Sequence, residues 1–133
     1  MTQSHTPSFL RRALLADASI SAATGLLMAL GATSLDSLLG LPTALLQYAG
    51  LGLLPIAAFI GYIAIRKPIA RPAVWLIIAC NGLWVLESIW LLLSGMVTPT
   101  GWGQAFVLTQ AACVTVLAEL EYIGLRRQGM TAA

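Results

Sequence analysis

Glu87 is the side chain of this sequence with the clearest potential for chemistry, because it is ionisable and lies deep inside a long apolar segment. Keeping an ionised carboxylate near the centre of a bilayer costs about 2.5 to 3.5 kcal/mol. On a helix, Asn81, Trp84 and Ser88 share a face next to Glu87. We expect these four side chains to form a polar wedge that points into the protein and binds a proton or a ligand. The structural alternative is a protonated Glu87 that hydrogen-bonds to a neighbouring helix.

A second group of ionisable residues lies near the ends of the first and last apolar segments. Asp17 follows Arg12 by five residues, and Glu119 and Glu121 precede Arg126 by seven and five residues. Side chains at this depth can reach the headgroup region, so we predict a cluster of solvated ion pairs at one membrane face. An entrance for protons or cations at the same face is the alternative.

The composition indicates that the natural solvent of this chain is lipid. Of 133 residues, 59% are hydrophobic and 9% are charged, and the mean hydropathy is +0.87. Soluble domains carry about 25% charged residues, so seven basic and five acidic side chains could not cover a water-exposed surface. The length allows one domain, residues 1–133.

Four apolar segments account for most of the length, and each matches the roughly 20 residues that a helix needs to cross a bilayer. They extend over about 13–32, 44–65, 72–93 and 104–125. The connections at 33–43 and 94–103 are rich in residues that favour turns, and the first has room for one interfacial helical turn. We therefore predict an all-α fold, an integral membrane four-helix bundle.

The basic residues all lie at the same predicted face of the membrane. They occur before the first segment, between the second and third, and after the fourth: Arg11, Arg12, Arg66, Lys67, Arg71, Arg126 and Arg127. Positively charged connections stay in the cytoplasm, so both termini and the middle connection are predicted to be cytoplasmic. A twin-arginine secretory signal beginning at Arg11 is the alternative, which the charge of Asp17 within the first segment disfavours.

Pro55 lies near the middle of the second segment and removes a backbone hydrogen bond there, so we predict a kinked helix. The kink could line a cavity or be a matter of helix geometry alone. In the first segment, Ser21, Gly25 and Ala29 have the four-residue spacing that lets two membrane helices approach closely. The sequence does not specify whether the partner helix belongs to the same chain or to a second copy.

Most familiar kinds of catalytic and cofactor site have no counterpart in the sequence. The only histidine, His5, lies in the polar N-terminal segment, so neither a haem ligated by two histidines nor a histidine-based metal site is expected. Glycine-rich phosphate loops and nucleophile elbows are absent from the sequence. We expect no enzyme activity, no cofactor and no metal. Nucleic-acid binding is not expected either, because the basic residues are confined to the segment ends.

Four stretches of the chain carry a resemblance to bacterial membrane proteins. They cover residues 17–25, 46–55, 81–88 and 118–122, and they include the strings LQYAGLGLLP and NGLWVLES. Through them, nearly the whole chain resembles uncharacterised four-span inner-membrane proteins of proteobacteria. The resemblance implies a location, the bacterial cytoplasmic (inner) membrane, and no reaction.

These observations favour an accessory or scaffold subunit of a larger membrane complex, because the chain has little soluble mass and no recognisable catalytic group. Its expected partners are the lipid bilayer and either another membrane protein or a second copy of itself. The alternative is a proton-coupled transporter of a small hydrophobic or cationic compound, acting as a homo-oligomer, in which Glu87 binds proton and substrate in turn. A membrane enzyme that acts on lipids is a third hypothesis.

Overall fold

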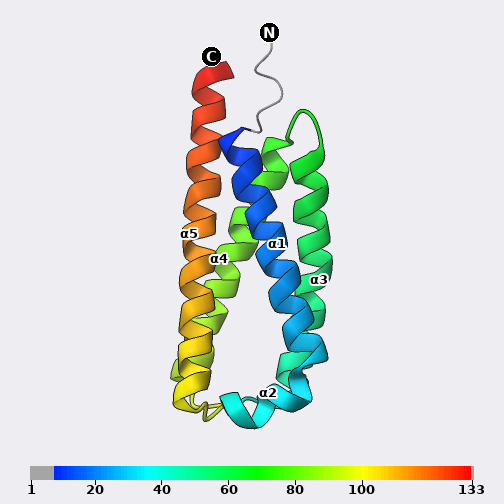
Figure 1. Cartoon of the computed structure of the whole chain (residues 1–133). Helices are drawn as coiled ribbons and strands as arrows, with labels where there is room; N and C mark the ends of the chain where they lie inside the picture. Colours follow the sequence, from blue (N-terminus) through cyan, green and yellow to red (C-terminus); the bar gives the residue numbers. More distant parts are fainter. Residues whose placement is uncertain (1–7, 133) are drawn as a thin grey trace.

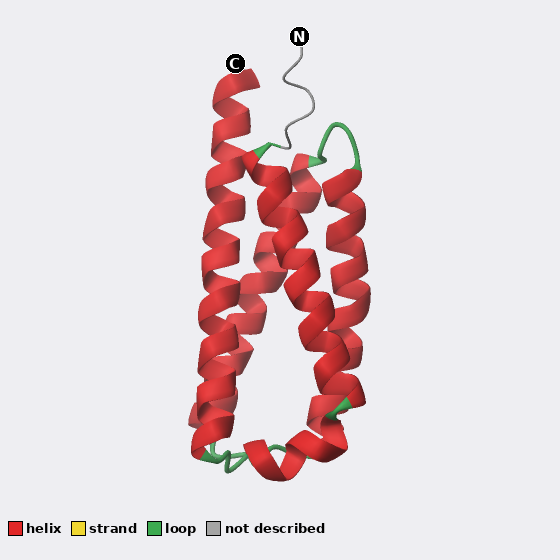
Figure 2. Cartoon of the chain, in the orientation of Figure 1, coloured by secondary structure: helices red, strands yellow, loops and turns green. Residues whose placement is uncertain are grey.

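The structure, a computed structural model, describes residues 8–132 and the side chains of residues 8–127; His5 lies outside both ranges. Every regular element in this part of the chain is an α-helix (Figure 2). In chain order the helices are α1 Phe9–Leu30, α2 Ala32–Leu39, α3 Thr43–Ile65, α4 Arg71–Ser94 and α5 Gly101–Ala132 (Figure 1). The predicted all-α fold is confirmed.

Four of the helices are long and apolar enough to cross a membrane, namely α1, α3, α4 and the part of α5 up to Arg127. This is the pattern of a multi-pass membrane protein, as the sequence predicts. The first helix begins earlier than predicted because the Ser8 hydroxyl accepts a hydrogen bond of 3.1 Å from the Arg11 backbone N–H and so caps the helix. The connection expected to hold one helical turn forms the 8-residue helix α2.

Pro55, where a kink was predicted, does not interrupt its helix. α3 continues through Pro55, whose side chain is exposed and lines neither of the two cavities described below. Membrane helices tolerate proline because neighbouring groups can satisfy the freed carbonyl.

Helices α1 and α3 pack backbone to backbone. At Gly50 of α3, a Cβ atom would lie 2.6 Å from the backbone nitrogen of Ala29 and 2.7 Å from the carbonyl oxygen of Gly25. Only glycine fits at this distance, and the close approach brings many backbone atoms into van der Waals contact. Gly25 and Ala29 belong to the predicted small-residue stripe, so the partner of that stripe is a helix of the same chain.

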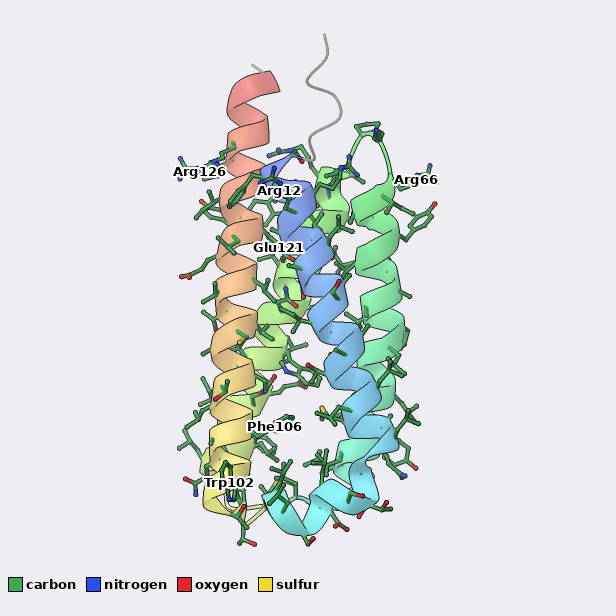
Figure 3. The ribbon with its side chains drawn as sticks, viewed as in Figure 1. Arg12, Arg66, Trp102, Phe106, Glu121 and Arg126 are labelled. Carbon is green, nitrogen blue, oxygen red and sulfur yellow. The ribbon has the colours of Figure 1, made fainter. Side chains whose placement is uncertain are left out.

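The long helices form two pairs that converge at one end (Figure 1). α1 pairs with α3 and α4 pairs with α5; α1 also packs against α5, whereas α3 and α4 make few contacts. Arg12, Arg66 and Arg126 lie where the pairs converge (Figure 3), beside the α3–α4 connection, and we call this the basic end. Its apolar core consists of Leu10, Leu14, Ile60, Ile63, Ala64, Ile69, Val74, Ile77 and Leu125.

At the opposite end, called here the α2 end, the two pairs separate, and α2 with the 95–100 connection runs between them (Figure 1). Thr100 joins the two: its backbone N–H donates to the Leu39 carbonyl at 3.0 Å and its hydroxyl to the Leu38 carbonyl at 2.6 Å. Gly40 turns the chain after α2 with a φ of +68°, in the left-handed region that favours glycine. A Cβ there would also lie 2.7 Å from the Thr100 nitrogen.

Candidate functional site

Three polar side chains from three different helices meet inside the bundle. The amide nitrogen Nδ2 of Asn81 on α4 donates to Oδ2 of Asp17 on α1 at 2.8 Å and to Oε1 of Glu121 on α5 at 3.1 Å. Asp17 is 1% exposed, Asn81 6% and Glu121 0%. We call these residues the carboxyl site. One amide nitrogen thus holds two carboxyl groups next to each other, away from both water and lipid.

The hydrogen bonding of the carboxyl site is incomplete. The Ser21 hydroxyl donates to Oδ1 of Asp17 at 3.2 Å, but Oε2 of Glu121 is buried with no hydrogen-bond partner. Two ionised carboxylates that share one donor repel each other strongly where water is excluded. A proton on one carboxyl, or a bound cation, would relieve this repulsion, so the site is chemically suited to take up a positive charge.

The predicted cluster of solvated ion pairs is wrong for Asp17 and Glu121. Asp17 and Glu121 face the interior instead of the headgroups, whereas Glu119, Arg12 and Arg126 are exposed. Residues two apart on a helix point in different directions, so Glu119 and Glu121 could not both face the same arginines. Within the described side chains, no ion pair links Arg12 or Arg126 to the carboxyl site.

The arginines of the basic end mostly bind backbone carbonyls and aromatic rings. Arg11 donates to the carbonyls of Ala64 and Arg66 at the end of α3, and Arg71 donates to the carbonyl of Leu125 within α5 at 2.8 Å. The guanidinium of Arg126 lies 5.9 Å from the ring centre of Tyr122. A cation is favourable at the end of α3, where backbone carbonyls lack helical partners, and none of these contacts neutralises the buried acids.

A second polar network lies closer to the α2 end. The indole N–H of Trp84 donates to Oε1 of Gln110 at 2.6 Å, and the Gln110 amide donates to the Ser88 hydroxyl at 3.0 Å and to the Val107 carbonyl at 2.9 Å. The Ser88 hydroxyl in turn donates to the Trp84 carbonyl at 2.8 Å. Each donor of this network is therefore already in use. Gln110 was not among the site residues predicted from the sequence, although a polar amide inside the fourth apolar segment could have indicated it.

The structure places three residues of the predicted polar wedge towards the interior of the bundle and Glu87 at its surface. Asn81 and Ser88 are buried and Trp84 is half-buried, but Glu87 is exposed. A helix turns about 100° per residue, so Glu87 points well away from Ser88, which follows it directly. The structure also divides the wedge, because Asn81 bonds to the carboxyl site while Trp84 and Ser88 bond to Gln110.

Two cavities occupy the space between the helix pairs at the α2 end. The first, about 490 Å³, lies among α1, α2 and α5, and Ser21, Trp102 and Phe106 line it. The second, about 430 Å³, lies between α3 and α4 with Glu87 in its wall. Three side chains line both cavities and so form the partition between the two: Trp84, Phe106 and Gln110. Phe106 is labelled in Figure 3, as is Trp102 in the wall of the first cavity. Both volumes are in the range of about 300 to 1,000 Å³ of small-molecule sites.

The first cavity reaches the carboxyl site. Ser21 lines this cavity and also donates its hydroxyl hydrogen to Asp17. A molecule in the cavity would thus be one side chain away from the buried carboxyl pair. Among the described residues, no group of three or more His, Cys, Asp or Glu side chains could hold a metal ion.

No protein-family model matches this chain, and no curated protein or solved structure is detectably similar to it.

Proposed function

We propose that this protein is a proton-coupled transporter of a small hydrophobic or cationic compound, in which Asp17, Asn81 and Glu121 hold the exchangeable proton. The observation that carries the proposal is the buried Oε2 of Glu121, which has no partner beside a second carboxyl group. A proton on Glu121 would supply the missing donor and remove one of the two negative charges. The proton role thus moves from Glu87, where the sequence suggested it, to the interior of the bundle.

Coupling between proton and compound would run through Ser21. The Ser21 hydroxyl can donate to Asp17, as it does in the structure, or turn towards the cavity that it lines. A change of protonation at the carboxyl site alters how strongly Asp17 accepts this hydrogen bond. The polarity of the cavity wall would therefore change when the carboxyl site gains or loses a proton. An exchanger needs such a link between protonation and binding of the compound.

The proposal includes an orientation and a membrane. The basic residues flank the membrane-spanning helices at one end, and positively charged connections are retained in the cytoplasm. We place both termini and the α3–α4 connection on the cytoplasmic side of a bacterial inner membrane. The cavities then lie in the half of the bundle away from the cytoplasm. Cysteine labelling of Lys67→Cys and Thr98→Cys from the two sides of the membrane tests this orientation.

The transport proposal is tested with purified protein in liposomes that contain a pH-sensitive dye and an acidic lumen. A panel of quaternary ammonium, phosphonium and uncharged aromatic compounds is added outside, with empty liposomes as the blank. We expect at least one compound to raise the luminal pH in the presence of the protein. If none does so beyond the blank, the protein is not a proton-coupled carrier of this class of compound.

A matched pair of variants assigns the proton to the carboxyl site. Glu121→Gln keeps the shape of the side chain and can donate a hydrogen bond to Asp17, so the fold should persist while coupled proton movement falls at least tenfold. Glu119→Gln, two residues away on the exposed face of α5, should keep the activity of the unmodified protein. Equal activity of the two variants would remove the carboxyl site from the mechanism.

The accessory-subunit hypothesis remains the second candidate because of one feature of α4. Gly82 is exposed, and a Cβ there would meet no atom within 4 Å, so a helix of another subunit could approach its backbone closely. Purification in mild detergent followed by mass spectrometry tests this candidate. A stoichiometric partner that is lost in Gly82→Leu but kept in Gly52→Leu would favour the accessory role over transport.

A further inference from the structure

We propose that the second cavity, between α3 and α4, binds a lipophilic monovalent cation, and that Glu87 neutralises the charge of this ligand. Its role as the transported substrate rests on the proposed function, whereas the binding site itself does not.

Glu87 is an acidic side chain inside a membrane-spanning helix, and it has no partner among the side chains that the structure describes. It lies seven residues before Ser94, the last residue of α4, which corresponds to about 10 Å along the helix axis. The structure gives it neither an ion pair nor a hydrogen bond with any described side chain, and it is exposed in the wall of the cavity. Because an isolated carboxylate at this depth is costly, a positive charge supplied from outside the chain would stabilise it.

Aromatic rings surround this carboxylate. Trp84, Trp90 and Tyr48 line the same cavity as Glu87, and Trp90 and Tyr48 are 58% and 76% exposed. The face of an aromatic ring attracts a cation, most strongly where water is excluded. The rings and the carboxylate therefore favour the same kind of ligand, one with an apolar body and a positive charge.

The polar network in the cavity wall is compatible with such a ligand. The side-chain donors of Trp84, Ser88 and Gln110 all point to partners within the protein. This network therefore leaves no donor for an anion or for the carbonyl of a neutral ligand. A phosphonium or quaternary ammonium ion needs no donor, so the carboxylate of Glu87 and the aromatic rings are sufficient to bind it.

Binding of radiolabelled tetraphenylphosphonium to the purified full-length protein in lipid nanodiscs, measured by equilibrium dialysis without a pH gradient, tests the inference. Tetraphenylborate, which has the same shape and the opposite charge, is the ligand control. We expect saturable binding of the phosphonium and none of the borate. Absence of saturable phosphonium binding, or equal binding of both ions, would overturn the inference.

Two variants then locate the site. Glu87→Gln should weaken phosphonium binding at least tenfold, because Glu87 is the one charged side chain among the described residues that line the cavity. Glu119→Gln removes an exposed acidic side chain of α5 from the same protein and should leave the affinity unchanged. If both variants bind the phosphonium as tightly as the unmodified protein, Glu87 does not hold the cation and the inference fails.

The outcome is separable from that of the transport experiment. Proton movement that depends on Glu121, together with phosphonium binding that is unaffected by Glu87→Gln, would contradict this inference and leave the proposed function in place. Phosphonium binding that depends on Glu87, without any coupled proton movement, would contradict the proposed function and leave the cation site in place.

Discussion

The two ends of the bundle are built from the same four long helices, but they pack differently. At the basic end, α1, α3, α4 and α5 converge on a continuous apolar core, and arginines bind carbonyls at the end of α3 and within α5. At the α2 end, the α1–α3 pair and the α4–α5 pair separate, and two cavities and a polar network lie between them. The carboxyl site holds the pairs together nearer the basic end. A four-helix membrane protein can therefore be closed at one end and hollow at the other, with ionisable groups placed between the two regions.

The difference has a physical cause in the residues that face inward. Leucine, isoleucine and valine fill the basic end and are almost fully buried, whereas Trp84, Phe106 and Gln110 are only half-buried at the α2 end. These three side chains line both cavities between the helix pairs, whereas branched aliphatic side chains pack directly against one another at the basic end. The predictions below test this comparison, from the largest expected effect to the smallest.

Gly50→Leu should have the largest effect, because it separates α1 from α3 and so destroys a pair that both ends share. The new side chain would have to displace the backbone at Ala29 and Gly25, which costs about 3 kcal/mol or more. Unfolding in increasing SDS, followed by circular dichroism, measures the loss. Gly52→Leu, where a Cβ meets nothing within 4 Å, is the control, and equal losses would mean that the close approach is not important.

Asn81→Leu should come second, since it removes the donor that both buried carboxyl groups share. We expect a loss of about 2 to 3 kcal/mol in the same unfolding experiment. Adding Glu121→Gln to this variant supplies a new amide donor for Asp17 and should restore part of the stability. No restoration in the double variant would contradict the idea that the Asn81 amide holds together two carboxyl groups that repel each other.

Gln110→Leu should have a smaller, local effect at the α2 end. It leaves the buried indole N–H of Trp84 without an acceptor, at a cost of about 1 to 2 kcal/mol. Tryptophan fluorescence should show a changed environment, while the basic end keeps its hydrogen-exchange protection. Gln104→Leu, an exposed glutamine on the same helix, is the matched control and should change neither measurement.

Thr100→Val should have the smallest effect on stability, about 1 kcal/mol, because it removes only the bonds of an exposed hydroxyl, which donates to the Leu38 carbonyl and accepts from the Gly103 backbone N–H. Hydrogen exchange in α2 should nevertheless become faster, since the bond to Leu38 helps to close the α2 end. Exchange in α1 near the basic end should stay as it is. Thr98→Val, at an exposed position of the same connection, is expected to have no such effect, and faster exchange in both variants would show that Thr100 has no special role.

Local patterns predicted the helices well because each span must satisfy its own backbone within the bilayer. The spans, the turn-rich connections and the confinement of basic residues to the helix ends follow from composition and chain order alone. The sequence also predicted the small-residue stripe of α1, but not the helix that packs against it. Gly50 of α3 became that partner only through the fold.

The candidate site was harder to predict because its residues come from distant parts of the chain. Asp17, Asn81 and Glu121 are separated by 64 and 40 residues, and depth along a helix does not say which way a side chain faces. Depth alone placed Asp17 and Glu121 at the headgroups and Glu87 in the interior, and the structure reverses both assignments.

By itself, the sequence determined that this is a membrane protein of four helical spans with its basic residues at one end, because lipid enforces helices and apolar length on any chain of this composition. Only the tertiary structure decided which helices pair, which ionisable side chains are buried and where the cavities lie. Those features depend on rotation of each helix about its axis, which is set by contacts between spans such as that of Gly25 with Gly50 and is not encoded within any single span.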